Sequence, residues 1–180
     1  MEKNLIILGA GGHGRVVKEA AEAMNVFDKI DFLDDNSEMA IGKLNAISEI
    51  SKEYKYAFVA IGSNELRMEW IKRIEELGYI LPVLIHPRAI VSPSASVYPG
   101  TIVTMGALVQ TNVVIEKGCI VGSGTIIDHD SFIGYGTHID SGAIVKSNCI
   151  VMSNKKVESG MIVTKKDLPT PNDFLKSKGF

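Results

Sequence analysis

The residues whose types could do chemistry are two histidines and one acid in the second half of the chain. His129 is followed directly by Asp130, and His138 comes nine positions after His129. Histidine titrates near neutral pH, so an imidazole can take up or release a proton during a reaction. Two plainer interpretations stay open at this point. His129 can be an exposed surface histidine, and Asp130 can be a turn residue without a chemical role.

A glycine-rich segment near the N-terminus has the spacing of a phosphate-binding turn. Residues 9–14 read Gly-Ala-Gly-Gly-His-Gly, between an apolar run at 5–8 and a predicted helix at 12–24. Glycines in such a turn let backbone N–H groups and the helix dipole approach a phosphate. Asp34 and Asp35 follow about twenty residues later, where an acid can accept hydrogen bonds from a ribose. The alternative is a tight turn followed by a solvated loop.

A repeat of six residues predicts the element that carries the two histidines. Val or Ile occupies every sixth position from residue 85 to residue 163. Three positions after most members stands a glycine, asparagine or aspartate, the residues that tolerate positive φ. Four positions after them a small residue usually stands, and both Cys119 and Cys149 belong to this set. The repeated members are Ile85, Val91, Val97, Val103, Val109, Ile115, Val121, Ile127, Ile133, Ile139, Val145, Val151, Val157 and Val163.

Each six-residue unit describes one flat side of a parallel β-helix, and three units close one triangular coil. An α-helix needs apolar residues spaced three and four positions apart, whereas the spacing here is six. The repeated residues are also β-branched, which favours strands, so an α-helix is excluded. We therefore predict a left-handed parallel β-helix over residues 85–164. Because open coil ends and flat outer faces need cover, we expect the chain to pack as a homotrimer.

The position of His129 within the repeat predicts where its side chain points. It lies two residues after Ile127, a position that faces outward from the coil. With eighteen residues in a coil, His129 and His138 are half a coil apart and do not easily meet within one subunit. They can meet across a trimer interface.

The part of the chain before the repeat alternates strands with helices. Strands are predicted at 5–8, 30–33, 57–61 and 83–85, and helices at 12–24 and 65–77. We expect a small Rossmann-like βαβ domain over residues 1–84, the β-helix over 85–164 and a C-terminal tail over 165–180. The fold class is thus α/β plus all-β. A dehydrogenase does not fit, because under ninety residues leave no second mononucleotide half.

Composition narrows the class of protein further. The 180 residues carry a net charge of −2 without a basic stripe, so a nucleic-acid partner is not expected. The N-terminal apolar run is too short for a signal sequence or a membrane span, which predicts a cytoplasmic protein with no membrane partner. The two cysteines lack redox or zinc spacing, and His86, His129 and His138 do not form the three-histidine cluster of a β-helical carbonic anhydrase. No metal site is expected.

Five segments in order resemble one known family. Residues 9–14, 32–35 (Phe-Leu-Asp-Asp), 60–67 (Ala-Ile-Gly-Ser-Asn-Glu-Leu-Arg), 85–87 (Ile-His-Pro) and 127–130 (Ile-Asp-His-Asp) resemble the sialic-acid and bacillosamine O/N-acetyltransferase family of sugar-modifying enzymes. The resemblance covers roughly residues 4 to 145, together with the repeat.

The resemblance implies roles for particular residues. His129 would take a proton from the attacking amine or hydroxyl, Asp130 would make that imidazole more basic, and His138 would contact CoA. Acetyl-CoA would be the acyl donor. A nucleotide sugar, typically UDP-linked, would be held by Gly11, Gly12, His13, Asp34, Asp35, Ile61 and Gly62.

The sequence also departs from the family pattern. Members usually carry an asparagine about seven residues before the catalytic histidine, where this chain has Gly122. They usually carry an alanine-glycine pair after the second histidine, where residues 146–148 read Lys-Ser-Asn. They also continue for about one more coil, so a shorter stack here leaves less groove for the pantetheine arm and adenine.

Three functions follow as hypotheses. The first is N-acetylation of a UDP-linked 4-amino-4,6-dideoxy sugar for surface glycan biosynthesis. The second keeps the same machinery with a hydroxyl acceptor, as in O-acetylation of a sialic acid. The third is a nucleotide-sugar-binding or scaffold protein that has lost its CoA site.

Overall fold

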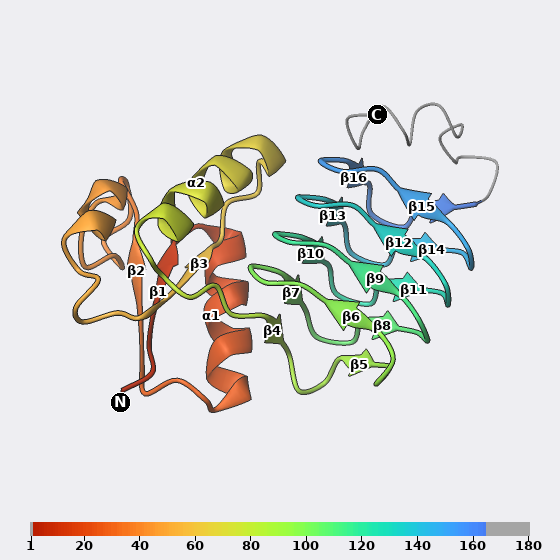
Figure 1. The fold of residues 1–180 in the computed structure, drawn as a ribbon, viewed down its shortest axis with the longest axis horizontal. Coiled ribbons are helices and arrows are strands. Elements are labelled where there is room, and N and C mark those ends of the chain that lie inside the picture. Colours follow the sequence, from red (N-terminus) through yellow and green to blue (C-terminus); the bar gives the residue numbers. More distant parts are fainter. Residues whose placement is uncertain (1, 165–180) are drawn as a thin grey trace.

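The N-terminal part is a three-stranded parallel sheet with a helix on each face (Figure 1). The structure, a computed structural model, describes residues 2–164. The strand order is β2-β1-β3, and every residue of β1 is buried, as expected for a parallel strand covered on both sides. The elements are β1 (Asn4–Leu8), α1 (Gly12–Met24), β2 (Lys29–Leu33), the 3₁₀ helix η1 (Leu44–Ser48), β3 (Tyr56–Val59) and α2 (Asn64–Glu76).

The side chains of β1 alternate between the two faces of this sheet, and they pack against α1 on one face and against α2 on the other. Leu5 and Ile7 share an apolar cluster with Val17 of α1, whereas Ile6 and Leu8 share another with Ile71 of α2. Successive side chains of a strand point to opposite faces, so one strand supplies both cores. The predicted βαβ arrangement is confirmed.

The rest of the described chain is a left-handed parallel β-helix, as predicted, built from two-residue strands (Figure 1). Strands β4, β7, β10, β13 and β16 form the face that lies against the N-terminal domain, here called the docked face. Strands β5, β8, β11, β14 and β17 form the aliphatic face, and β6, β9, β12 and β15 form the aromatic face.

The strands of the three faces share one repeating register. Partners in neighbouring coils lie eighteen residues apart, as in Ile120↔His138. The docked face has β4 (Leu84–Ile85), β7 (Ile102–Val103), β10 (Ile120–Val121), β13 (His138–Ile139) and β16 (Lys156–Val157). The aliphatic face has β5 (Ile90–Val91), β8 (Leu108–Val109), β11 (Ile126–Ile127), β14 (Ile144–Val145) and β17 (Ile162–Val163). The aromatic face has β6 (Ser96–Val97), β9 (Val114–Ile115), β12 (Phe132–Ile133) and β15 (Ile150–Val151).

The predicted Val/Ile ladder forms the interior of the β-helix. Ladder residues from Val103 to Val157 join one buried cluster, which also contains Cys119 and Cys149 as free thiols. The hydroxyl groups of small polar residues in the interior form hydrogen bonds with the backbone. Thr101 Oγ1, for example, donates to the Glu116 carbonyl at 3.0 Å and accepts from the Cys119 N–H at 3.1 Å.

The turns between faces use the residues that the repeat marked for positive φ. Asn112, Asp130, Asn148 and Asn154 all have φ between 57° and 59°. Seven of the glycines at the same repeat position also have positive φ, namely Gly100, Gly106, Gly118, Gly124, Gly136, Gly142 and Gly160. A residue with left-handed φ at each of these corners lets the chain turn by a fixed amount from one face to the next.

One predicted strand belongs to a different sheet. Residues 83–85 were expected to join the N-terminal sheet, but the observed strand Leu84–Ile85 pairs with β7 of the β-helix. The physical reason is that Leu84 is buried in the same column as Ile102 and Ile120, against α1. This strand is therefore the first of the docked face.

Helix α1 separates the N-terminal sheet from the β-helix (Figure 1). Its Val17, Ala20 and Ala21 share a cluster with Leu84, Ile102 and Ile120 of the docked face. No helix among residues 2–164 is long and apolar enough to cross a membrane. The predicted tail, residues 165–180, lies outside the described residues.

Candidate active site between the two domains

A cavity of about 200 Å³ lies where the N-terminal domain meets the docked face. From the N-terminal domain it is lined by His13, Val16 and Gly62. From the β-helix it is lined by Thr104, Ile120, Gly122, Ser123, His138, Asp140 and Ser141. The cavity thus joins two of the predicted nucleotide-sugar residues, His13 and Gly62, to the predicted CoA-contacting His138.

His13 presents an unused hydrogen-bonding atom to this region. Its Nε2 is buried and has no hydrogen-bond partner among the residues that the structure describes. Burial, and then the nearby imidazole of His138 and the charge of Arg67, lower the pKa of His13 to about 4. The imidazole is therefore neutral at physiological pH. A buried polar atom without a partner is costly, and a ligand group that bonds to Nε2 would remove that cost.

His138 stands on β13 with an acid nearby. Its Nε2 lies 3.8 Å from Asp140 Oδ1, which is an electrostatic contact longer than a hydrogen bond. Burial lowers the pKa of His138, and Asp140 opposes that shift. The Asp140 carboxylate is itself held by the Ser141 N–H at 2.8 Å and by Lys156 Nζ at 3.4 Å. His138 is thus a second neutral imidazole in the same cavity.

Backbone contacts hold the glycine-rich turn tightly. Gly9 has a positive φ of +103°, a conformation that favours glycine. Gly14 packs so closely on Gly9 that a Cβ at position 14 would lie 2.1 Å from the Gly9 carbonyl oxygen. Asp34 Oδ2 accepts from the Ala10 N–H at 2.8 Å, and this bond holds the pKa of Asp34 below its usual range. By contrast, a Cβ at Gly11 or Gly12 would meet nothing within 4 Å. Their backbone at the start of α1 is thus open to a ligand.

A second hollow, of about 310 Å³, lies beside this turn. Asp34 and Asp35 line it together with Lys43 and the segment between them. Asp35 Oδ1 accepts from the Leu44 N–H at 3.1 Å, so both predicted acids also organise their own loop. Ile61 contributes its carbonyl to Arg67 at 3.0 Å and does not line either hollow.

His129 and Asp130 lie at a different corner of the β-helix, between the aliphatic and aromatic faces. His129 Nδ1 lies 2.7 Å from Asp130 Oδ2, and their side chains are 50% and 46% exposed. A carboxylate only accepts, so Nδ1 donates and Nε2 stays free to accept a proton. The bonds from His129 and then Asn112 hold the pKa of Asp130 below its usual range. Within one subunit this pair does not line the cavity.

Sequence reasoning missed most of the β-helical lining. Thr104, Gly122 and Asp140 are each eighteen residues apart, as are Ser123 and Ser141. One coil is eighteen residues, so counting back and forward from His138 would have placed them together. At Gly122 a Cβ would meet the Ser141 nitrogen at 2.7 Å, so the backbone of this chain leaves no room for a side chain there.

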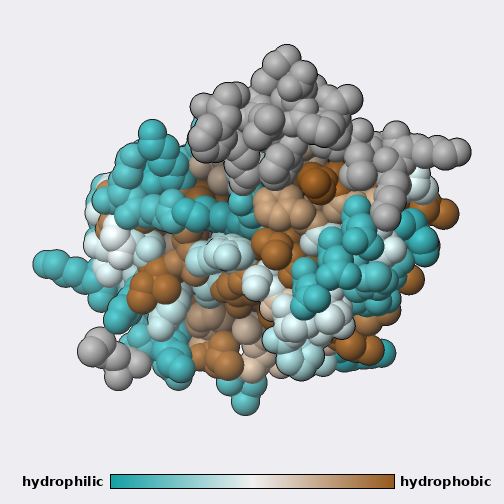
Figure 2. Space-filling model, turned by 45° about the vertical axis from the view of Figure 1, so that its right-hand side comes forward, coloured by the Kyte–Doolittle hydropathy of each residue, from teal (hydrophilic) through white to brown (hydrophobic). Residues whose placement is uncertain are grey.

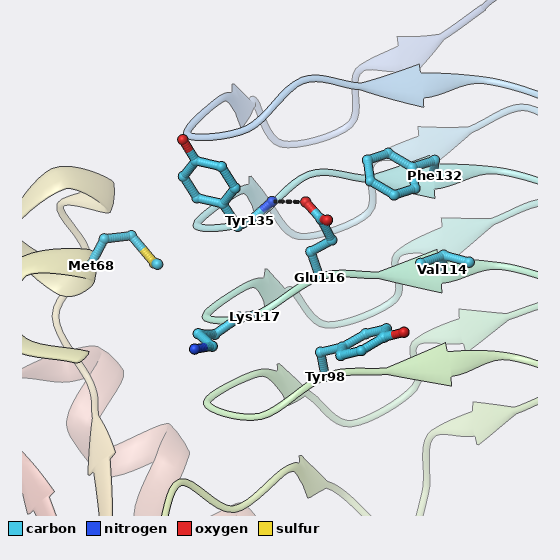
Figure 3. Close-up of a pocket in the computed structure, with 7 residues that line it drawn as sticks. All are labelled: Met68, Tyr98, Val114, Glu116, Lys117, Phe132 and Tyr135. Carbon is cyan, nitrogen blue, oxygen red and sulfur yellow. Dashed lines mark hydrogen bonds between the residues drawn. The ribbon is translucent and has the colours of Figure 1, made fainter. Parts of the chain in front are cut away.

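A third hollow, of about 480 Å³, lies on the aromatic face beside α2 (Figure 3). It is lined by Met68, Tyr98, Val114, Glu116, Lys117, Phe132 and Tyr135. Its lining has no histidine, and it includes none of the predicted site residues. Among residues 2–164, no three His, Cys, Asp or Glu side chains gather into a group that could hold a metal ion.

Comparisons with known proteins agree on one family. Residues 4–74 match the family model described as the PglD N-terminal domain. UDP-N-acetylbacillosamine N-acetyltransferase of Bacillus subtilis (strain 168) is 31% identical over 102 residues. That match covers 52% of this chain and 47% of the relative, so the alignment spans about half the length of the curated protein.

Several solved structures match over nearly the whole chain. The acetyltransferase domain of PglB from Neisseria gonorrhoeae FA1090 has a TM-score of 0.85 and 31% identity, covering 93% of this chain and 94% of that one. The same domain has also been solved in complex with acetyl coenzyme A. PerB from Caulobacter crescentus, in complex with CoA and GDP-perosamine, has a TM-score of 0.77 and 26% identity, covering 92% and 90%.

A βαβ domain docked on a left-handed β-helix is the architecture of hexapeptide-repeat acyltransferases, and this chain has that architecture, with histidines lining the cavity between its two parts. More particularly, the chain belongs to the sialic-acid/bacillosamine-type sugar O/N-acetyltransferase family.

Proposed function

We propose that this chain is an acetyl-CoA-dependent N-acetyltransferase that acts on a UDP-linked 4-amino-4,6-dideoxy sugar in surface glycan biosynthesis. The observation that carries this proposal is the cavity at the domain boundary, which is lined both by His138 and by His13, whose buried Nε2 has no hydrogen-bond partner among residues 2–164. A nucleotide sugar bound at the glycine-rich turn would reach this cavity with its sugar end.

The N-terminal domain supplies groups suited to the nucleotide. The open backbone of Gly11 and Gly12 at the N-terminus of α1 suits a diphosphate, because helix N-termini bind anions. The hollow at Asp34 and Asp35 suits the ribose and base. His13 and Gly62 would then contact the part of the substrate that enters the cavity.

The proposed general base is His129, assisted by Asp130. Because this pair lies at another corner of the coil, it would serve the cavity of a neighbouring subunit in a homotrimer. The aliphatic face, which runs between those two corners, offers a matching surface. Its outward column is Ile90, Leu108, Ile126, Ile144 and Ile162, and Ile90 and Ile162 are 68% and 56% exposed.

The chemistry requires one bond to form and one to break. The sugar amine attacks the thioester carbonyl of acetyl-CoA, so a C–N bond forms and the C–S bond breaks. His129 Nε2 would take the proton from the amine, while the negative charge of Asp130 stabilises the imidazolium. The imidazolium of His129 would then pass this proton to the departing CoA thiolate. His138 is the residue proposed to contact CoA beside the reacting atoms.

The test is CoA-thiol release from acetyl-CoA with a UDP-linked 4-amino sugar, with wild type and His129→Ala compared. We expect robust release with wild type and a loss on the order of 10² to 10⁴-fold in the variant. GDP-linked and hydroxyl-bearing acceptors in parallel assays identify the nucleobase and the accepting group. Retained UDP binding without any turnover would overturn the proposal and favour the binding-protein hypothesis.

A second experiment tests whether the site is shared between subunits. His129→Ala and His138→Ala are mixed after reversible dissociation, or co-expressed. Random assortment leaves about one site in four with both histidines intact if the two come from neighbouring subunits. We expect the mixture to recover activity that neither variant has alone. If the mixture stays as inactive as its parents, the shared site is wrong.

A further inference from the structure

Arg67, in the first turn of α2, is a buried cation whose hydrogen-bond donors are all used. Its side chain is 1% exposed. Nε donates to the Gly118 carbonyl at 2.8 Å, and Nη2 donates to the Gly136 carbonyl at 2.8 Å and to Asn64 Oδ1 at 2.8 Å. A guanidinium has five N–H groups. The remaining two, on Nη1, have acceptors in the N-terminal domain.

Nη1 donates to the carbonyls of Ile61 and Gly62, at 3.0 and 3.2 Å. Gly62 lines the cavity, and Gly136 lies two residues before His138, which lines it from the other side. One rigid planar group therefore bonds to the loop of the nucleotide domain and to the coil that carries His138. All five acceptors are neutral oxygens, so the charge of Arg67 is not cancelled by any of them.

We propose that Arg67 is a positioning residue, which fixes the Ile61–Gly62 loop against the β-helix and thereby sets the geometry of the proposed nucleotide-sugar site. This inference rests on the proposed function. Neighbouring contacts support the same junction. Met68 packs over Gly118 and Gly136 and points from α2 toward the coils of Lys117 and Tyr135 (Figure 3). Lys117 Nζ pairs with Glu75 Oε1 at 2.7 Å.

The unpaired charge of Arg67 also acts on the two histidines of the cavity. It lowers the pKa of His13, after burial and His138, and it lowers the pKa of His138. The other charged groups that act on His138 are Asp140 and Glu158, which raise its pKa, and Lys156, which lowers it. Arg67 thus helps to keep both imidazoles neutral.

Two variants separate geometry from charge. Arg67→Lys keeps a cation but replaces a planar five-donor fork by a three-donor ammonium. Arg67→Gln removes the charge as well. Arg73→Lys is the matched control, because Arg73 is exposed on the same helix and stacks on Trp70. Circular dichroism and thermal unfolding first establish that each variant is folded.

The first measurement needs no substrate. NMR titration of the imidazole signals follows His13 and His138, with His86 and His129 as internal references. In Arg67→Gln we expect the pKa values of His13 and His138 to rise. In Arg67→Lys and Arg73→Lys we expect them to stay near those of wild type. Unchanged titration of both histidines in Arg67→Gln would contradict the electrostatic part of the inference.

The second measurement is UDP binding by calorimetry, followed by kinetics with the nucleotide sugar. For Arg67→Lys we expect UDP affinity to fall by about tenfold and kcat/KM by on the order of 100-fold, as for a small misplacement of reacting groups. The KM for acetyl-CoA should change less than that for the nucleotide sugar. A folded Arg67→Lys with wild-type UDP affinity and wild-type KM values would overturn the proposal. If wild type neither turns over nor binds UDP, the proposed function fails, while the titration still decides the role of Arg67.

Discussion

His13 links the stability of the fold to pH, because its imidazole is kept neutral inside the protein. Its pKa falls from 6.5 to about 4 on folding. Above pH 6.5 neither state binds the proton, so stability is unaffected. As the pH falls from 6.5 to about 4, the unfolded state takes up a proton that the folded state does not, and stability is lost. The loss should reach about 2 to 3 kcal/mol near pH 4.

His13→Gln should therefore reduce the pH dependence of unfolding. We expect urea unfolding of wild type to show a free energy that falls between pH 7 and pH 4.5, and a shallower fall in the variant. Equal slopes for the two proteins would show that the His13 imidazole is not held neutral.

Thr101 tests the interior hydrogen bonds of the β-helix. Thr101→Val conserves shape but leaves the buried N–H of Cys119 without the hydroxyl that accepts from it at 3.1 Å. An unsatisfied buried donor costs about 1 to 3 kcal/mol, which chemical denaturation can measure. Thr111→Val, at an exposed turn, is the control and should change stability by less than about 0.5 kcal/mol. Equal effects would mean that the interior bond is unimportant.

At the scale of residues, some of the residues singled out from the sequence line the cavity, whereas most of the β-helical residues around them were not predicted. His13, Gly62 and His138 do line one cavity, but nothing in a six-residue repeat says which face the N-terminal domain covers. The three faces are equivalent in pattern until α1 packs on one of them. For that reason Asp140 and Ser141, which carry no motif, were not predicted.

At the scale of elements, two glycines at corners of the β-helix have nearly the same backbone conformation but different surroundings. Gly136 and Gly142 have φ +65° and +69°, but only Gly136 is crowded. A Cβ there would lie 2.3 Å from Asn154 Oδ1 and 2.7 Å from Met68 Cγ, whereas at Gly142 it would meet nothing within 4 Å. Gly142→Ala should cost about 1 to 2 kcal/mol from positive φ alone.

Gly136→Ala should cost clearly more than Gly142→Ala, because the side chains of Met68 and Asn154 must also move away from the corner. The measurement is the difference in unfolding free energy between the two variants. Equal destabilisation would indicate that Met68 and Asn154 move aside without loss, and that the contact with α2 contributes little.

The elements themselves were largely predictable because each follows from a local period. Helix α1 begins and ends where the pattern placed it, and the inward ladder is buried as expected. The strand at Leu84–Ile85 was assigned to the wrong sheet because it satisfies both patterns. It is an apolar run after a helix and also the first member of the six-residue repeat, and only the burial of Leu84 against Ile102 decides between them.

At the scale of the whole molecule, the aliphatic face is proposed to be buried between subunits. Ile126→Glu, in the middle of its outward column, should place a charge in that interface and convert a trimer into monomers. Light scattering after size exclusion gives the mass directly. Ile80→Glu, at an exposed position of the N-terminal domain, is the control. An unchanged mass for Ile126→Glu would mean that another surface joins the subunits.

Apolar residues reach the surface at several places in the view of Figure 2. Exposed large apolar side chains of the β-helix include Ile90, Tyr98, Met105, Tyr135 and Ile162. Association through more than one face would cover them, and the trimer would then be part of the stability of each subunit.

The eighteen-residue register has a consequence for how such chains can change in length. Adding or removing one whole coil keeps every downstream residue on its own face. The Val and Ile residues of the ladder then stay inside, and the turn residues stay at the corners. A change of six or twelve residues keeps the interior but moves each later segment to another face, and a change that is not a multiple of six residues breaks the interior itself. Evolution can thus lengthen or shorten this β-helix in steps of one coil, while the histidines of the site keep their relative directions.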